Sequence, residues 1–299
     1  MIEVNGLSRS ISGRRVLEAV SCTIQDGHIT GLVGPAGAGK SVLMRTLAGS
    51  EPIRSKGSVL YDGTSLTKIR STASKVGAYM GADSLPDTMT GMALVRYAAR
   101  IGGAKSSRVS EVVGLVGGAE HLIEPLSECS REDRHRAGIA AAIVNDPDHI
   151  LLDDPLNGLS PTSVTWLRGL LRALSDSGKA VLMSAEMVSD IELIADDVVV
   201  LDRGRVIKQG TMEDLIGSNG VDVLIKTSDD NKMAALLASR NIMAIPTADG
   251  LRISGISPRT AGQLAYANSL FVDSLSEIYT PLEGWSAPAE NAAFPGGEA

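Results

Sequence analysis

The sequence predicts an α/β fold in which a largely parallel sheet is covered by helices on both faces, followed by a small α+β domain. Short apolar strands alternate with amphipathic helices over about the first 210 residues. After about residue 220 the order changes to strand, helix, strand, strand, helix, strand. That second order is typical of a ferredoxin-like unit.

The first part of the chain supplies apolar strands and one glycine-rich connection. The predicted strands lie near residues 2–4, 19–24, 28–34, 58–61 and 76–80. The strand over 28–34 runs into a glycine loop, and the helix that follows begins near Lys40 with an apolar face. Asp62 and Gly63 predict a hairpin turn after the fourth strand.

A helical block interrupts this alternation. Between about residues 88 and 145 three segments show helical periodicity, so we expect an inserted helical subdomain there. The alternation then resumes with a strand that ends near Asp154 and a long helix with Pro161 in its first turn. A further strand and a hairpin around Arg203 and Gly204 follow.

These patterns divide the chain into two predicted domains. Residues 1–216 form the α/β domain, with the helical subdomain at about 88–145. Residues 221–282 form the small α+β domain. Residues 283–299 are rich in Ala, Gly and Pro, and we expect them to be disordered.

Composition and charge limit the classes of function. The 299 residues carry a net charge of −7 and only 3% aromatic residues, which weighs against a nucleic-acid partner. Cys22 and Cys129 form neither a disulfide framework nor a zinc motif. The apolar runs are too short for a signal peptide or a membrane span, so we expect a cytoplasmic protein.

A phosphate-binding loop is the strongest motif in the chain. It matches G-x-x-x-x-G-K-[S/T] between an apolar strand and a helix. Glycines let backbone N–H groups face phosphates, and the helix dipole adds to the attraction. Lys40 would reach the β- and γ-phosphates, and Ser41 would bind magnesium. The alternative is an ordinary glycine-rich turn. The predicted nucleotide contacts in this loop are Gly34, Pro35, Ala36, Gly37, Ala38, Gly39, Lys40, Ser41 and Val42.

The stretch ILLDDPLNGLSP, residues 150–161, predicts the second half of the same site. Asp153 follows a buried apolar strand, which is where a carboxylate holds magnesium in P-loop proteins. The alternative role for Asp153 is that of a helix-capping acid. With the loop, Asp153 predicts a site for ATP and Mg²⁺.

The residues around Asp153 resemble one family of P-loop proteins. LLDDPLNGLSP is similar to the LLLDEPTNGLDP stretch of ATP-binding cassette (ABC) proteins, and VVVLDRGRVIKQGT is similar to their closing hairpin. The helical insertion and the trailing small domain resemble daunorubicin-resistance-type ATP-binding subunits of exporters. The resemblance covers residues 1–220 well and 221–280 weakly.

This resemblance implies partners. ABC cassettes form a head-to-tail homo- or heterodimer, so a second ABC subunit would share two ATP molecules with this chain. Each ATP would lie between one subunit's P-loop and the other's signature sequence. The family also implies an integral-membrane permease, and so a peripheral position on the inner face of the cell membrane. No nucleic-acid partner is expected.

Two positions on the hydrolytic side differ from the family pattern. The family has Glu after the Walker B Asp to polarise water, and this chain has the shorter Asp154. Misplacement by about an ångström can lower a rate on the order of a hundredfold; the alternative is a conservative exchange with an adjusted backbone. Glu186 occupies the slot of the switch histidine, and an ionised carboxylate cannot donate to a γ-phosphate. The alternatives for Glu186 are a substitute base and an exposed residue at a helix start.

The signature sequence also differs. The family motif LSGGQ corresponds to Cys129–Asp133, in which Ser130 is retained and Arg131 and Glu132 replace the two glycines. Ser130 and Asp133 also predict a capping box. The acids of this helix would then compete for the place of a phosphate, whereas the alternative is that Arg131 contacts phosphate.

Three further slots differ from the family. Gly81, with Asp83 nearby, stands where the family has Gln, and Ser160 stands where it has Asp. Ile11 takes the place of the aromatic residue that stacks on adenine, and it offers less dispersion and no π-stacking.

Two groups of side chains near this region each have two interpretations. Met80, Met89 and Met92 suit an adaptable surface for a permease, or belong to the core. Four basic residues form either a rim patch or a solvated helix face. They are Arg131, Arg134, His135 and Arg136.

The groups that bind phosphate and magnesium are thus retained, and those that place water and sense the γ-phosphate are not. We predict a subunit that binds Mg-ATP and couples dimerisation to a permease, as part of an exporter. We expect its hydrolysis to be slow or partner-dependent. The competing hypothesis is a non-hydrolysing structural or regulatory subunit of a membrane complex.

Overall fold

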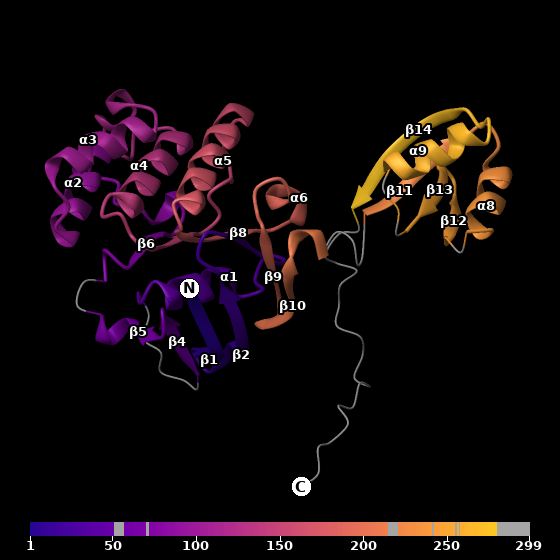
Figure 1. Ribbon diagram of the computed structural model, residues 1–299. Helices are drawn as coiled ribbons and strands as arrows, with labels where there is room; N and C mark the ends of the chain where they lie inside the picture. The colour runs from indigo at the N-terminus through magenta and orange to yellow at the C-terminus, as the bar shows by residue number, and fades with distance from the viewer. Residues whose placement is uncertain are drawn as a thin grey trace, which may run out of the picture. The chain divides into compact units, whose positions relative to one another are not determined.

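The computed structural model describes residues 1–50, 57–69, 72–214, 221–240, 242–254, 256 and 258–279. The chain divides into two compact units, Met1–Asp214 and Leu215–Ala299 (Figure 1). The predicted boundary between the domains and the predicted disordered tail lie outside the described residues.

The first unit is built on a six-stranded sheet in the order β10-β9-β3-β8-β7-β6. Its parallel strands are β3 (Ile29–Val33), β6 (Val76–Tyr79), β7 (His149–Leu152), β8 (Ala180–Ala185) and β9 (Asp197–Asp202). Strand β10 (Arg205–Thr211) adds an antiparallel edge. Every residue of β3, β7 and β8 is buried, as expected where helices cover both faces of a parallel sheet. The predicted α/β class is confirmed.

A second, antiparallel sheet has the order β2-β1-β4-β5, and sequence analysis did not separate it from the first. It consists of β1 (Ile2–Ile11), β2 (Arg14–Ile24), β4 (Ser58–Tyr61) and β5 (Thr64–Ser65). Asp62 and Gly63 have φ angles of 47° and 75° and form the predicted hairpin turn.

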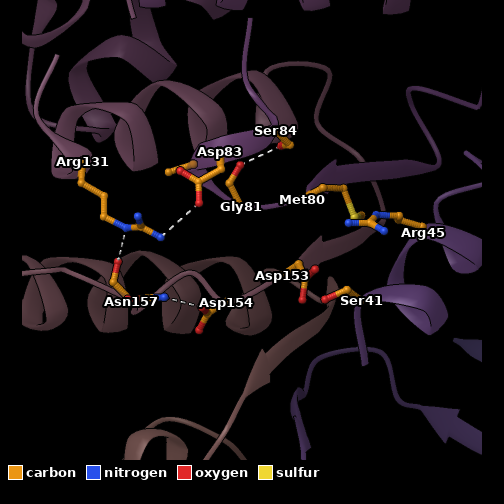
Figure 2. A pocket seen from close by; sticks show the side chains of 11 residues that line it. Ser41, Arg45, Met80, Gly81, Asp83, Ser84, Arg131, Asp153, Asp154 and Asn157 are labelled. Carbon is orange, nitrogen blue, oxygen red and sulfur yellow. Dashed lines mark hydrogen bonds and ion pairs between the residues drawn. The ribbon is translucent and has the colours of Figure 1, made fainter. Parts of the chain in front are cut away.

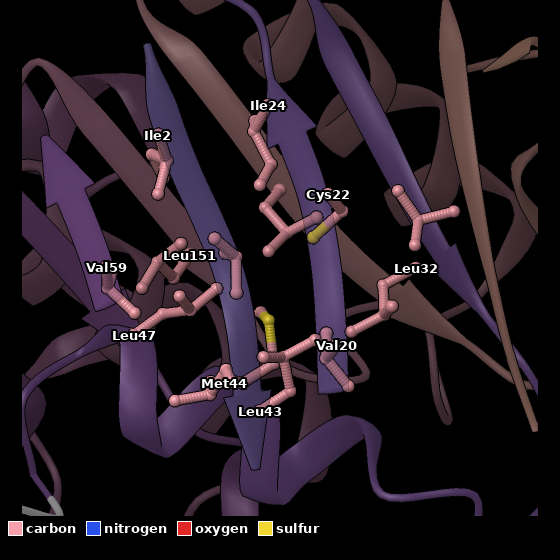
Figure 3. Close-up of a cluster of buried hydrophobic side chains, with 14 of the residues drawn as sticks. Ile2, Val20, Cys22, Ile24, Leu32, Leu43, Met44, Leu47, Val59 and Leu151 are labelled. Atoms are coloured by element: carbon pink, nitrogen blue, oxygen red, sulfur yellow. The ribbon is translucent and has the colours of Figure 1, made fainter. Parts of the chain in front are cut away.

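One core cluster joins the two sheets through helix α1 (Lys40–Leu47), as Figure 3 shows. The helix contributes Leu43, Met44 and Leu47 to this cluster, all of them fully buried. Burying an apolar side chain of this size is worth about 1.5–3 kcal/mol. The first turn of α1, and the loop before it, are therefore held in place by packing on both sheets.

Helices α2 (Gly91–Gly102), α3 (Ser106–Leu115) and α4 (Arg131–Ile143) lie between β6 and β7 in the chain, which confirms the predicted helical insertion. The long helix α5 (Pro161–Asp176) follows β7 and has Pro161 in its first turn. The short helix α6 (Val188–Ile191) follows β8. Within the described ranges, every helix is too short or too polar to cross a bilayer.

Three of the four basic residues of α4 point inward, so neither a rim patch nor a solvated face describes them. Arg134 donates to the backbone oxygens of Ala82 and Leu126. His135 is fully buried. The Arg136 guanidinium lies 4.2 Å from the centre of the Trp166 ring on α5. Both interpretations were wrong here because the loop after β6 and helix α5 cover this side of α4.

The three methionines differ in what is known of their surroundings. Met80 packs against the core cluster and lines the cleft described below. Met89 and Met92 are half-buried. The interpretation as core residues therefore fits Met80.

The second unit contains β11 (Val221–Thr227), α8 (Asp230–Ala238), β12 (Ala244–Thr247), β13 (Gly250–Ile253), α9 (Pro258–Ala267) and β14 (Val272–Tyr279). Its sheet has the order β12-β13-β11-β14 and is antiparallel. Both helices share one core cluster with the sheet through Met233, Leu237 and Ala261. This is the predicted order of a ferredoxin-like unit.

The close contact between β6 and α4 makes a prediction about stability. A Cβ on Gly77 would lie 2.1 Å from the backbone oxygen of Ala142. We expect Gly77→Ala to lower the free energy of unfolding by about 1–3 kcal/mol, because strand and helix must separate. Gly169→Ala on α5 is the matched control, since a Cβ there meets no atom within 4 Å. Urea unfolding measures both, and equal losses would contradict the prediction.

Candidate functional site

Residues 34–39 form a tight loop between β3 and α1. Gly37 and Gly39 have φ angles of +80° and +106°, which side chains other than glycine rarely adopt. A Cβ on Gly34 would lie 2.0 Å from a backbone oxygen of β9. The turn between β9 and β10 donates a backbone N–H to Ala38 O at 2.9 Å. The loop is therefore fixed by the main sheet on one side and by this turn on the other.

Lys40 lies over this loop at the start of α1. Its Nζ donates to two loop carbonyls at 2.6 and 3.1 Å. Burial lowers the pKa of Lys40, and the nearby carboxylates of Glu186, Asp153 and Asp154 act in the opposite direction. The structure thus places one lysine among three of the acids that sequence analysis singled out.

Asp153 and Asp154 follow β7 and are joined through Ser184 of β8. The Ser184 hydroxyl donates to Asp153 Oδ1 at 2.6 Å and accepts from the Asp154 N–H at 2.8 Å. Asp153 is only 6% exposed, so this bond satisfies a buried carboxylate. Asp154 has a φ of 50°, a left-handed conformation that Asp tolerates better than most residues.

Asp153 and Asp154 line a cleft of about 370 Å³. Figure 2 shows Ser41 and Asp153 side by side, whereas Asp154 points toward Asn157. Hydroxyl and carboxylate oxygens are ligands that Mg²⁺ prefers, so Ser41 and Asp153 fit that metal. The lining residues are Ser41, Arg45, Met80, Gly81, Ala82, Asp83, Ser84, Arg131, Asp153, Asp154 and Asn157.

The Asp154 side chain is hydrogen-bonded within its own loop. Asn157 Nδ2 donates to Asp154 Oδ2 at 2.7 Å. One carboxylate oxygen is therefore used inside the chain, and Oδ1 is the oxygen left for a water in the cleft.

Ser130 is the N-cap of α4. Its hydroxyl oxygen accepts from the Asp133 N–H at 3.1 Å, and the hydroxyl donates to Asp133 Oδ2 at 2.6 Å. The predicted cap on the backbone N–H is therefore present. The resemblance implies that Ser130, as part of the signature sequence, would face a nucleotide, whereas its hydroxyl is bonded to its own helix.

Glu132 ties the start of α4 to the start of α5. It accepts hydrogen bonds from Ser160 at 3.1 Å, from Arg136 at 3.1 Å, and from Ser163. The bonds from Ser163, Arg136 and Ser160 lower the pKa of Glu132 to about 2, against the opposing effect of burial. Two departures from the family pattern, Glu132 and Ser160, are thus partners of each other.

Arg131 lies against loops of its own chain. Its Nε donates to Asn157 O at 3.2 Å, and its guanidinium lies 3.6 Å from Asp83 Oδ2 (Figure 2). Gly158, with a φ of +80°, leaves room for this side chain, since a Cβ there would lie 2.7 Å from Arg131 Cδ. The guanidinium therefore faces the cleft that Asp153 and Asp154 also line.

The remaining predicted residues are placed in different ways. Glu186 is exposed just after β8, and Gly81 lines the cleft with a φ of 90°. Val42 packs against the core cluster, which leaves its backbone N–H as the group able to face a phosphate. Ile11 ends β1, is 41% exposed, and is not among the residues that line the cleft. Pro35 and Ala36 are exposed at the tip of the loop.

Four residues of the cleft were not predicted from the sequence: Arg45, Ala82, Ser84 and Asn157. Arg45 follows Ser41 by four positions on α1, so helical spacing alone places it on the same face. Asn157 follows Asp154 by three positions in a turn, which is a spacing that local side-chain hydrogen bonds use. Both signals were in the sequence, although neither reveals the contact between Asn157 and Arg131.

Comparison with known proteins identifies the family. The family profile described as ABC transporter matches residues 17–157. The chain is 32% identical over 315 residues to the daunorubicin/doxorubicin resistance ATP-binding protein DrrA of Streptomyces peucetius, covering 96% of this chain and 93% of that protein. It is 29% identical over 242 residues to the bacitracin transport ATP-binding protein BcrA of Enterococcus faecalis, covering 80% and 78%.

A solved structure supports the fold. An ATP-binding subunit of an ABC transporter matches with a TM-score of 0.65 and 24% identity, covering 72% of this chain and 91% of that chain.

The Glu132 cluster makes a prediction about pH. The folded chain keeps this carboxylate ionised down to a pH of about 2, whereas the unfolded chain protonates it near 4.5. Its hydrogen bonds therefore stabilise the fold fully above 4.5, and the contribution is lost as the pH falls toward 2. We expect Glu132→Gln to lower the free energy of unfolding by about 1.5 kcal/mol at pH 7 and by less at pH 3.

Urea unfolding at both pH values measures this difference. Glu128→Gln, at an exposed position of the same segment, is the control, and we expect it to have little effect at either pH. A loss for Glu132→Gln that is the same at pH 7 and pH 3 would contradict the prediction.

Proposed function

This chain belongs to the family of ABC transporter ATP-binding subunits, and we propose that it binds Mg-ATP and couples nucleotide-driven dimerisation to a membrane permease, with weakened hydrolysis. One observation carries the proposal. The P-loop and the cleft beside it keep the groups that would hold phosphate and magnesium, while the positions that would place water or contact a partner's phosphate are changed or bonded within the chain.

The part of the site that would bind phosphate and magnesium is complete in its chemistry. The loop of Gly34 to Gly39 presents backbone N–H groups at the N-terminus of α1, where the helix dipole favours anions. Lys40 carries the cation for the β- and γ-phosphates, and Ser41 and Asp153 offer oxygen ligands for magnesium. Magnesium would neutralise developing charge on the phosphates when it is bound.

The hydrolytic half is weaker. A general base must come within about 2.6–3.2 Å of the proton that it takes. Asp154 is one methylene shorter than Glu, and with Oδ2 held by Asn157 only Oδ1 remains to act on a water. Glu186 adds a negative charge near Lys40, where the family's histidine would donate a hydrogen bond. We therefore expect water to be poorly oriented in this cleft.

The surface that would meet a partner's ATP is also changed. Glycines in the family motif allow close approach of the backbone, and this chain has Arg131 and Glu132 there. Ser130 and Glu132 use their oxygens in bonds within the chain. A homodimer would carry both weaknesses at each site, and a heterodimer would receive one weakened half at each site.

The names of two relatives suggest that the complex formed with the permease is an exporter. Their printed names describe daunorubicin/doxorubicin resistance and bacitracin transport. We propose that this chain lies on the inner face of the cell membrane, bound to a permease that selects the substrate. A second candidate is a non-hydrolysing regulatory subunit, which the combined changes at Asp154, Glu186 and Arg131 favour.

Binding of Mg-ATP tests the first half of the proposal. We expect Lys40→Ala to weaken binding about ten- to a hundredfold, because it removes a charged hydrogen-bond donor from the phosphates. Lys68→Ala, at an exposed position outside the cleft, is the matched control and should bind as the unaltered chain does. Titration calorimetry measures all three proteins. Absence of binding in the unaltered chain would refute the proposal.

The rate of ATP hydrolysis tests the second half of the proposal, which is weakened hydrolysis. We expect the purified chain to hydrolyse ATP far more slowly than a typical enzyme rate of about 10 per second. The double change Asp154→Glu and Glu186→His should raise turnover on the order of ten- to a hundredfold, since it restores reach and a donor. Phosphate release measures both rates, and adding Lys40→Ala to the double variant should remove the gain.

The outcomes also separate the two candidate functions. A complex with its permease that is already active, and is inactivated by Lys40→Ala, supports the energising subunit. A large gain from the double change in an otherwise inactive complex supports the regulatory subunit. A rate near 10 per second from the unaltered chain alone would overturn weakened hydrolysis.

A further inference from the structure

A closed ring of hydrogen bonds includes three residues that line the cleft, Asp153, Asp154 and Asn157. It passes through four segments of the first unit: β6, α4, the loop after β7, and β8. Each of its members bonds to the next one at a distance between 2.6 and 2.9 Å. In order, they are Tyr79, His135, Asn157, Asp154, Ser184 and Asp153, which returns to Tyr79.

His135 is the member that belongs to the helical subdomain. Its Nε2 lies 2.9 Å from Asn157 O, and its Nδ1 lies 2.8 Å from the Tyr79 hydroxyl. A carbonyl oxygen only accepts, so Nε2 must carry the hydrogen and Nδ1 accepts from Tyr79. His135 is fully buried, and burial lowers its pKa, which keeps the imidazole neutral.

Tyr79 makes two contacts of the ring, one through its hydroxyl and one through its backbone oxygen. Its backbone oxygen accepts from the Asp153 N–H at 2.8 Å, as part of the pairing of β6 with β7. Its ring packs against α4 at Gly138, where a Cβ would lie 2.3 Å from Tyr79 Cε2. The end of β6 is thus held both to Asp153 and to the helix that carries His135.

Asn157 joins the imidazole to the carboxylate. Its backbone oxygen accepts from His135, and its side-chain amide donates to Asp154 Oδ2 at 2.7 Å. Moving the backbone at Asn157 therefore moves the donor that holds Asp154. The position of Asp154 Oδ1, the oxygen left for water, depends on this contact.

We propose that His135 is a positioning residue for the nucleotide site: as the Nε2–H tautomer it links α4 to Asp154 through Asn157. A shift of the helical subdomain then changes the place of Asp154 Oδ1 without any contact between α4 and nucleotide. This inference rests on the proposed function, because Asp154 acts only if the cleft holds ATP.

Two conservative changes cut the ring at different points. Tyr79→Phe removes the hydroxyl and keeps the ring that packs on Gly138. Asn157→Ala removes the amide and keeps the backbone oxygen that His135 uses. We expect each change to lower kcat about tenfold, because Asp154 loses its fixed place, with the KM for ATP changed less than about twofold.

The double variant distinguishes a ring from two separate contacts. Once one hydrogen bond of the ring is removed, removing a second should lower kcat little further. We therefore expect the double variant to have about the same kcat as either single variant. Losses that multiply would overturn the proposal. His135→Gln offers one donor and one acceptor at the same place and should retain more activity than His135→Leu.

Matched controls separate this effect from lost stability. Tyr61→Phe removes another buried hydroxyl, which donates to Leu47 O outside the ring. Asn145→Ala removes another amide of the helical subdomain, which donates to Ala98 O at 2.9 Å. We expect both controls to keep the kcat of the unaltered chain, and a loss in them equal to that of the ring variants would overturn the proposal.

Nitrogen NMR of the imidazoles tests the ring independently of turnover. We expect His135 to be the Nε2–H tautomer and its Nε2 signal to shift when Mg-ATP is added. Asn157→Ala should remove that shift while calorimetry shows the same affinity. A Nδ1–H tautomer, or an equal shift in the variant, would overturn the ring. Absence of binding in the unaltered chain would instead overturn the proposed function.

Discussion

The hydroxyl of Ser184 sets the geometry on which the cleft depends. It donates to Asp153 Oδ1 and accepts from the Asp154 N–H, so one buried group fixes two successive residues. Strand β8 lies between β3 and β7, and Ser184 is paired in register with Leu32, two residues before the P-loop begins. The spacing between the P-loop and the Walker B carboxylate therefore follows from the register of three parallel strands, whose backbone positions are among the least adjustable in the protein.

Charge bears on the proposal that this cleft binds nucleotide more readily than it hydrolyses it. Lys40 is a single ammonium near three carboxylates, Asp153, Asp154 and Glu186. A polyphosphate entering this cleft would need a divalent cation to offset repulsion from the acids, and in the proposed function Ser41 and Asp153 would supply its ligands. Glu186 puts an acceptor at the position where the family's histidine would donate to the terminal phosphate.

Local motifs were predictable from the sequence, and long-range contacts were not. The P-loop, the Asp62–Gly63 turn, the helical insertion and the cap at Ser130 each depend on neighbouring residues, so spacing and residue type suffice. The bond between Glu132 and Ser160 joins residues 28 positions apart, and no periodicity indicates it. Arg134 and Arg136 were expected at a surface because charge alone suggests solvent, whereas their long side chains reach carbonyls of neighbouring segments.

Several of the residues that differ from the family pattern are hydrogen-bonded or ion-paired within the chain. Glu132 bonds to Ser160, Arg131 pairs with Asp83, and Asp154 bonds to Asn157. An Asp in place of Ser160 would bring a second carboxylate next to Glu132, and like charges at that distance repel. Restoring one family residue alone would therefore remove a partner rather than rebuild the family's geometry. The departures are parts of one folded arrangement, in which these side chains bond to one another or to neighbouring loops within the chain.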